Sequence, residues 1–154
     1  MKKVLPALLS AALLLSFAAC GASGEAASAK TTPASGDVVS ADLPDGWTLV
    51  SGTDMNGAGG SDYICRSKEF QIGDPYLQAA RDDRDAAGMQ ALLEGEDPFG
   101  TYYGSFELAN GIWYIAENAA GAVLGEKTLL VKGYECDFQS DEVRTILGSI
   151  QWAA

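Results

Sequence analysis

The sequence GSFELANGIWYIA at residues 104–116 carries the strongest local signal for the fold. Asn110 and Gly111 tolerate the positive φ angles that a type I′ turn requires, and both flanks are rich in aromatic and branched side chains. The stretch therefore predicts a β-hairpin that turns at Asn110 and Gly111. Because a two-residue turn joins antiparallel strands, it also predicts an antiparallel sheet.

Strand patterns recur on both sides of this hairpin. In residues 127–132, Leu129 and Val131 alternate with Thr128 and Leu130, so both faces are apolar. This pattern is typical of a central strand that is covered on each side. Shorter strands are expected at residues 47–51, 63–66 and 75–81, and the alanines of the last segment leave a helix as its alternative. Residues 121–125 are expected to form a loose connection.

Two helices are expected as well. Asp85 has the position of an N-cap for a helix that ends near Gly95, and Ser140 has the position of an N-cap for a second helix. The second helix carries one apolar stripe, formed by Val143, Ile146, Leu147 and Ile150. The predicted fold class is therefore α+β, an antiparallel β-sheet with helices packed on its faces.

The N-terminus has the pattern of an export signal. Lys2 and Lys3 precede an apolar stretch, residues 4–17, which is shorter than the roughly 20 residues of a permanent membrane span. The stretch is followed by Ala18-Ala19-Cys20, which resembles the lipobox of bacterial lipoproteins. The resemblance implies cleavage before Cys20 and lipidation of its sulfur, and so a domain held on the extracytoplasmic side of the cell membrane. The alternative is an ordinary secretory signal that is cut near Ala19.

Composition divides the chain into three parts. Residues 1–19 are expected to be a signal peptide, residues 20–37 a flexible linker rich in Ala, Ser and Gly, and residues 38–154 a single α+β domain.

The charge balance is strongly acidic. The chain has 10 Lys and Arg against 21 Asp and Glu, and removal of residues 1–19 takes away two lysines and no acid, which changes the formal charge from −11 to −13. Such a surface argues against nucleic acid as a partner, because phosphate binding needs Lys and Arg. The chain contains no histidine, which excludes Ser-His-Asp and Cys-His catalysis.

Three stretches together resemble the PsbP-like and Mog1-like superfamily. They are LPDGWTLVS at residues 43–51, the pair ANGIWYIAE and KTLLVKGYECDF at 109–117 and 127–138, and DEVRTILGSIQW at 141–152. The resemblance implies an α/β/α sandwich, an antiparallel sheet with helices on both faces. It also implies an accessory or binding role without a shared active site, so it transfers no functional residues.

Cys65 and Cys136 are the cysteines that remain once Cys20 is lipidated. In an exported protein such a pair is expected to form a disulfide. The alternative is that both are buried free thiols that act as small apolar side chains.

Asp83, Asp85 and Glu94 are a weak calcium candidate. With Gly88 they nearly match the calcium loop D-x-[DN]-x-[DN]-G-x5-E, but Ala87 replaces the third ligand. The same residues also fit a capped helix. We expect no cofactor and no further metal site.

Two other segments invite a functional interpretation. Residues 54–62 form an acidic, glycine-rich loop that is best explained as a flexible connection, since it lacks the lysine of a phosphate loop. One aromatic set could line a groove for a sugar or peptide, although the core is the favoured place for it: Tyr102, Tyr103, Phe106, Trp113 and Tyr114.

These observations predict a membrane-anchored, non-enzymatic accessory or ligand-binding module. Its expected partners are the membrane, through the lipid anchor, and an unknown envelope protein or ligand. The alternative is a small cell-envelope hydrolase that uses paired carboxylates.

Overall fold

The computed structural model describes residues 30–154 apart from residues 58, 68, 72 and 96. The strands of this part are β1 (Thr31–Ser35), β2 (Val39–Pro44), β3 (Thr48–Ser51), β4 (Ser61–Cys65), β5 (Tyr76–Asp82), β6 (Tyr102–Leu108), β7 (Gly111–Ala116), β8 (Ala119–Leu124), β9 (Lys127–Tyr134) and β10 (Gln151–Trp152). The helices are α1 (Gly52–Asn56), α2 (Ala86–Glu94) and α3 (Asp141–Ser149).

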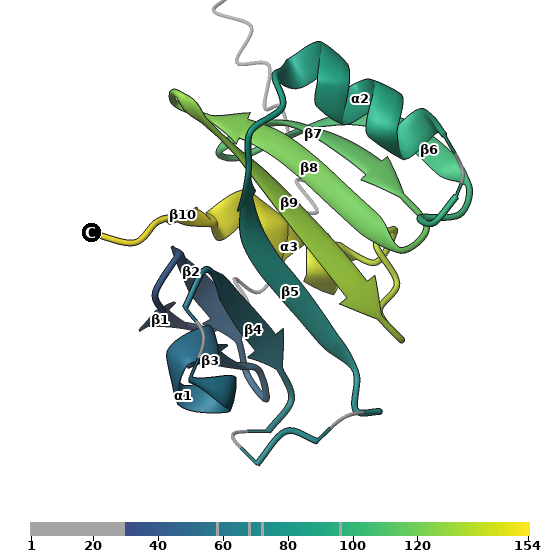
Figure 1. The fold of residues 1–154 in the computed structure, drawn as a ribbon. Coiled ribbons are helices and arrows are strands. Elements are labelled where there is room, and N and C mark those ends of the chain that lie inside the picture. Colours follow the sequence, from purple (N-terminus) through teal and green to yellow (C-terminus); the bar gives the residue numbers. More distant parts are fainter. Residues whose placement is uncertain (1–29, 58, 68, 72, 96) are drawn as a thin grey trace, which may run out of the picture.

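Two antiparallel sheets form the body of the molecule (Figure 1). The larger has seven strands in the order β3-β4-β5-β9-β8-β7-β6, and the smaller has three in the order β1-β2-β10. β9 lies in the middle of the larger sheet, as its two apolar faces predicted. The predicted α+β class with an antiparallel sheet is therefore confirmed.

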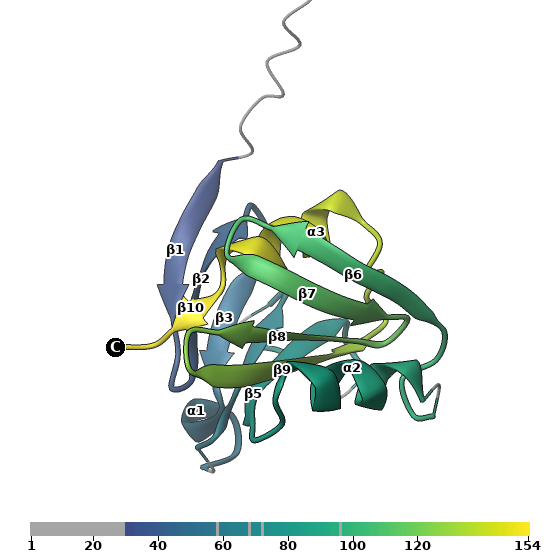
Figure 2. The ribbon, with the colours of Figure 1, turned by 90° about the horizontal axis from the view of Figure 1, so that it is seen from above.

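The main core lies between the larger sheet, the smaller sheet and α3. α3 begins after Ser140, whose side chain accepts a hydrogen bond from the Val143 amide at 3.3 Å, and its predicted stripe of Val143, Ile146, Leu147 and Ile150 is buried there. α2 packs on the other face of the larger sheet (Figure 2). The α/β/α sandwich is not confirmed, because the sheets dominate and the layer opposite α2 combines α3 with the smaller sheet.

β8 was not predicted, since residues 121–125 were expected to form a loose connection. Its sequence AAGAVL is poor in the branched residues that usually mark strands. The small residues have a packing reason, because α2 lies directly over this strand. A Cβ atom on Gly121 would overlap the side chain of Met89, which is fully buried in a second core under α2.

The hairpin is confirmed, but its turn lies one residue earlier than expected. Leu108 pairs with Gly111, so the turn residues are Ala109 and Asn110. The Asn110 amide donates to the carbonyls of Leu147 at 2.7 Å and Ile150 at 2.8 Å, and its oxygen accepts from Trp113 Nε1 at 2.8 Å. Asn110 therefore fastens the hairpin to the C-terminal end of α3.

The folded part begins earlier than the sequence indicated. Residues 20–37 were expected to be a flexible linker, but Thr31–Ser35 form β1, and every residue of β1 pairs with a residue of β2. The pairing explains the difference, because main-chain hydrogen bonds to β2 need no apolar pattern in β1.

A buried carboxylate joins the two sheets. Asp62 in β4 is fully buried and accepts hydrogen bonds from the amides of Asp37, Val38 and Val39 at 2.7–2.8 Å. Gly36 lies directly against it, and a Cβ atom there would overlap the carboxylate. The acidic segment 54–62 is thus not a plain flexible connection, since it contains the end of α1 and this buried residue.

Candidate functional site

Four aromatic rings meet on the surface of the larger sheet, and we call them the aromatic face. They belong to Tyr63 in β4, Phe70 in the following loop, Tyr76 in β5 and Tyr134 in β9. Phe70 and Tyr76 have ring centroids 5.1 Å apart, and Tyr76 stacks on Tyr134 at 5.8 Å. Tyr63 completes the group at 6.0 Å from Phe70 and 5.8 Å from Tyr76.

Strand alternation and register explain why these rings meet. Ile64 and Leu77 are neighbours of Tyr63 and Tyr76 in sequence and point into the main core, so the two tyrosines point to the opposite face. Tyr76 pairs directly with Tyr134 across β5 and β9. Gln78 supports the group, because its amide donates to the Tyr63 hydroxyl at 3.1 Å.

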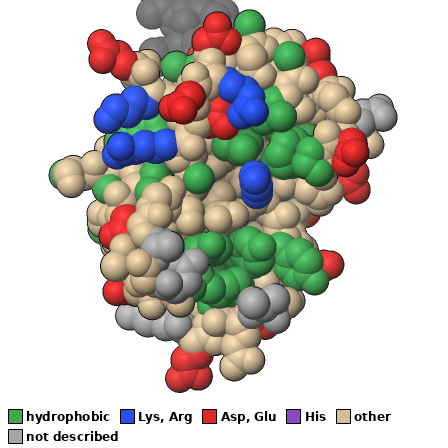
Figure 3. All heavy atoms as spheres, in the orientation of Figure 1, with side chains coloured by type: hydrophobic (Ala, Val, Ile, Leu, Met, Phe, Trp, Pro, Cys, Tyr) green, Lys and Arg blue, Asp and Glu red, His purple; other side chains and the backbone are tan. Residues whose placement is uncertain are grey.

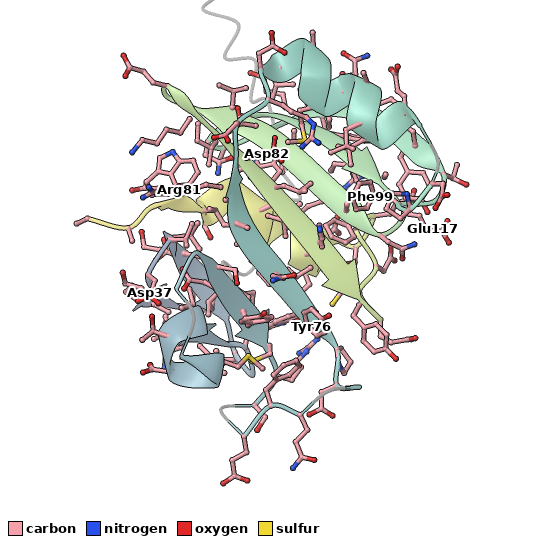
Figure 4. All side chains as sticks on the ribbon, in the orientation of Figure 1. Asp37, Tyr76, Arg81, Asp82, Phe99 and Glu117 are labelled. Carbon is pink, nitrogen blue, oxygen red and sulfur yellow. The ribbon has the colours of Figure 1, made fainter. Side chains whose placement is uncertain are left out.

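The aromatic face lies on the same side of the sheet as α2 but beyond its reach. Leu130 and Tyr134 are four residues apart in β9 and share this side; Leu130 lies in the core under α2, whereas Tyr134 is 44% exposed. Figure 3 shows the resulting patch of hydrophobic side chains over the lower part of the sheet, and Figure 4 shows Tyr76 within it. An exposed aromatic group of this kind is a candidate contact for a ligand or partner.

A lysine lies beside the aromatic face. Lys132 is two residues before Tyr134 in β9, so it is on the same side of the sheet, and it pairs with Gln78 in β5. Glu135, which follows Tyr134 in sequence, lines a separate cavity with Arg66 and Val143.

The start of β1 lies on the opposite side of the molecule from β5, β9 and α2 (Figure 2). The chain that precedes the folded part therefore joins it on the side away from the aromatic face.

The sequence analysis singled out other aromatic residues. Trp113 is fully buried in the main core, and Tyr103 and Phe106 pack against the same core. Tyr102 and Tyr114 pack against the core under α2. The five thus serve the cores, as the favoured interpretation held. The aromatic face was missed because its strands are far apart in sequence, although the alternation of Tyr63 with Ile64 was a usable signal.

The predicted disulfide between Cys65 and Cys136 is not present in the structure, where both are free thiols. Cys65 follows Ile64 and so points away from the main core, whereas Cys136 packs against that core. The Cys65 thiol donates to the Ser67 carbonyl at 3.1 Å, and the Cys136 thiol donates to the Tyr76 carbonyl at 3.4 Å. Burial raises the pKa of both thiols, that of Cys136 to about 11.

The calcium candidate does not assemble. Asp85 caps α2, since its Oδ1 accepts from the Gly88 amide at 2.8 Å, and Glu94 is the last residue of the same helix. Nine residue positions separate them, so at about 1.5 Å of rise per residue their backbone positions lie about 13.5 Å apart along the helix axis, too far for the two residues to share an ion. Within the described residues, no three His, Cys, Asp or Glu side chains form a group that could hold a metal.

A cavity of about 620 Å³ lies between the end of β5 and the turn that joins β8 to β9. Several acids line it, but two of them already have other roles. Asp82 forms an ion pair with Arg84 at 2.5 Å, and Asp85 caps α2. The remaining acids in its wall are Asp83 and Glu126.

Cys20 lies outside the described residues, so its predicted lipidation stays a prediction. None of the described helices combines the length and hydrophobicity needed to cross a membrane. Comparisons with protein-family models, with curated proteins and with solved structures find no match to this chain.

Proposed function

We propose that this chain is a membrane-anchored extracytoplasmic lipoprotein whose folded domain is a non-enzymatic binding module. The aromatic face is its contact surface. The observation that carries the proposal is the group of four rings on an uncovered part of the sheet. Tyr63, Phe70 and Tyr76 contact one another and Tyr134 stacks on Tyr76, all outside the two cores. A contact surface explains such a group more simply than structural support does.

The lipid anchor and the aromatic face are compatible in this proposal. With β1 beginning at Thr31, about 11 residues separate Cys20 from the folded part, and a flexible chain of that length spans about 17–20 Å. A domain of about 125 residues is roughly 35 Å across. A tether shorter than the domain would keep the β1 side towards the lipid and direct the aromatic face away from it.

The PsbP-like and Mog1-like relationship is part of the same proposal. The order of elements supports it, because an antiparallel sheet is followed by a capped helix near the C-terminus. The accessory roles that the resemblance implies agree with a binding module. The alternative, a hydrolase with paired carboxylates, has less support, because Asp82 and Asp85, which line the cavity at the end of β5, are held by Arg84 and by the start of α2.

Two experiments in intact bacterial cells test the proposal. Labelled palmitate should be incorporated into the wild-type chain and not into a Cys20→Ser variant; equal labelling would contradict the anchor. For the binding surface, a photo-crosslinking amino acid is placed at Tyr134, which is 44% exposed, or at Ile112 on β7, which is 56% exposed and serves as the control. An adduct from position 134 that is absent from position 112 supports the contact surface, and no adduct from position 134 refutes it.

A further inference from the structure

β1 has few contacts that hold it to the rest of the domain. Four of its five side chains are exposed, and the fifth, Ala34, packs against the main core. β1 is also the outer strand of the smaller sheet, so it pairs along one edge only (Figure 2). A segment with few buried contacts and exposed main-chain hydrogen bonds is among the first parts of a protein to open locally.

The residues of β2 that hold β1 follow from strand alternation. The Ser149 hydroxyl lies 3.0 Å from the Asp42 amide and 3.2 Å from the Asp42 carbonyl, so both main-chain groups of Asp42 face away from β1. Because successive residues of a strand alternate, the main-chain groups of Ala41 and Leu43 face β1. β1 is therefore held to the domain mainly through these two residues.

The segment that follows β1 is held much more firmly. Gly36 lies directly against the buried Asp62 carboxylate. Val38 and Val39 are buried as well, and their amides donate to Asp62 at 2.7 and 2.8 Å. Hydrogen bonds to a carboxylate are stronger than those between neutral backbone groups. The strength of attachment thus changes abruptly at Gly36.

The composition of β1 suits a free state as well as a bound one. Its sequence TTPAS contains no large apolar side chain, so its release exposes little apolar surface to water. β1 and β2 form a hairpin whose closed end is the segment bound to Asp62 and whose open end is Thr31, where the preceding chain attaches. A pull on Thr31 loads the bonds of the hairpin one after another, so β1 peels away from its open end.

From these observations we infer that β1 is a releasable part of the membrane tether. It exchanges between a state paired with β2 and a free state, and the contact with Asp62 ends the release at Gly36. The role as a tether rests on the proposed lipid anchor at Cys20, whereas the release itself is a property of the folded domain. Five further residues add at most about 17 Å to the reach of the tether. The free state lets the domain move that much further from the membrane while its fold is retained.

Native-state hydrogen exchange followed by NMR tests the release, in the chain without residues 1–19 and with Cys20→Ser. The reporters are the β1-bound amides of Ala41 and Leu43 and the Asp62-bound amides of Val38 and Val39, all from buried residues. After correction for intrinsic rates, the β1-bound amides should exchange at least 100-fold faster, because the release of β1 frees only this pair. A difference below 10-fold refutes the release.

A disulfide between the two strands provides a locked form. Pro33 and Asp42 are direct partners with exposed side chains, and the main chain of Asp42 faces away from β1. The Cα atoms of such a non-hydrogen-bonded pair lie about 4.5 Å apart, within the range that a disulfide bridges. The locked form is the oxidised double variant Pro33→Cys, Asp42→Cys, and its matched control is the same protein after reduction. Circular dichroism verifies that both forms retain the fold.

Oxidation of the double variant should slow the β1-bound amides at least 10-fold more than the Asp62-bound amides. If it slows both pairs equally or neither pair, exchange does not proceed through release of β1 and the inference is wrong. The measurements use the soluble chain and do not involve the aromatic face, so a refuted release leaves the proposed contact surface standing. Failed palmitate labelling of Cys20 would overturn the role of β1 in a tether, while a measured release would stand.

Discussion

The substitution Asp62→Asn tests the connection between the two sheets. The Asp62 carboxylate is fully buried; its Oδ1 accepts from the Asp37 amide at 2.8 Å, and its Oδ2 accepts from the amides of Val38 and Val39 at 2.7 and 2.8 Å. No described Lys or Arg forms an ion pair with it. The negative charge is therefore balanced by backbone N–H groups of the segment that joins β1 to β2.

Asparagine keeps the shape of the side chain but replaces one acceptor oxygen with an NH₂ group. If the remaining oxygen faces Val38 and Val39, the NH₂ group meets the Asp37 amide as donor against donor. Loss of one hydrogen bond to a charged group costs about 1.5–3 kcal/mol, and the two remaining bonds weaken because the acceptor is now neutral. We expect a loss of about 3–5 kcal/mol, a large share of the 5–15 kcal/mol typical of a domain.

Urea unfolding measures the effect, with the fluorescence of the three tryptophans as the signal. The control is Asp54→Asn, an exposed aspartate in α1, which should change the free energy of unfolding by less than about 0.5 kcal/mol. The melting temperature of Asp62→Asn should fall by about 10–20 °C. A loss below 1 kcal/mol with an unchanged denaturant slope would refute the stabilising role of this carboxylate.

Three further predictions concern stability and ions. Asn110→Ala removes two hydrogen bonds to the end of α3 and leaves Trp113 Nε1 without its acceptor, so it should cost about 2–4 kcal/mol in urea unfolding; an effect below 1 kcal/mol would contradict the role given to Asn110. Burial raises the folded-state pKa of Cys136 from 9.0 to about 11, so the contribution of its neutral thiol to the free energy of unfolding is complete below pH 9 and is lost as the pH rises towards 11. By pH 10.5 the wild type should lose about 2 kcal/mol more than Cys136→Ala. Parallel pH profiles of the two proteins would contradict this role. Asp85→Ala should lower stability by about 1 kcal/mol through loss of the helix cap, while 5 mM calcium should leave the melting temperature of the wild type unchanged, and a calcium-induced rise would revive the ion site.

The features that could be predicted from sequence are those with local causes. Asp85 and Ser140 cap their helices as expected, because an N-cap depends on hydrogen bonds to residues two or three positions away. The features that the sequence did not predict depend on contacts with residues that are far away in the chain. β8 is made of small residues because α2 packs over Gly121, and the hairpin turn lies one residue early, where the Asn110 side chain bonds to α3.

The candidate site was less predictable than the fold for the same reason. Tyr63, Tyr76 and Tyr134 come from three strands, and they meet only once the register of β4, β5 and β9 is established. Whether Cys65 and Cys136 can form a disulfide likewise depends on which side of the larger sheet each side chain faces. A shift of one residue in a strand would exchange those faces.

The sequence by itself determined the antiparallel hairpin, the two capped helices and the acidic charge, because these depend on neighbouring residues or on composition. Only the tertiary structure decided that Asp62 is buried between two sheets, that the two thiols lie on different faces, and that four aromatic rings meet on one face of the larger sheet. Each of these depends on which distant segments are brought together, and sheet register and core packing, rather than local preference, decide that.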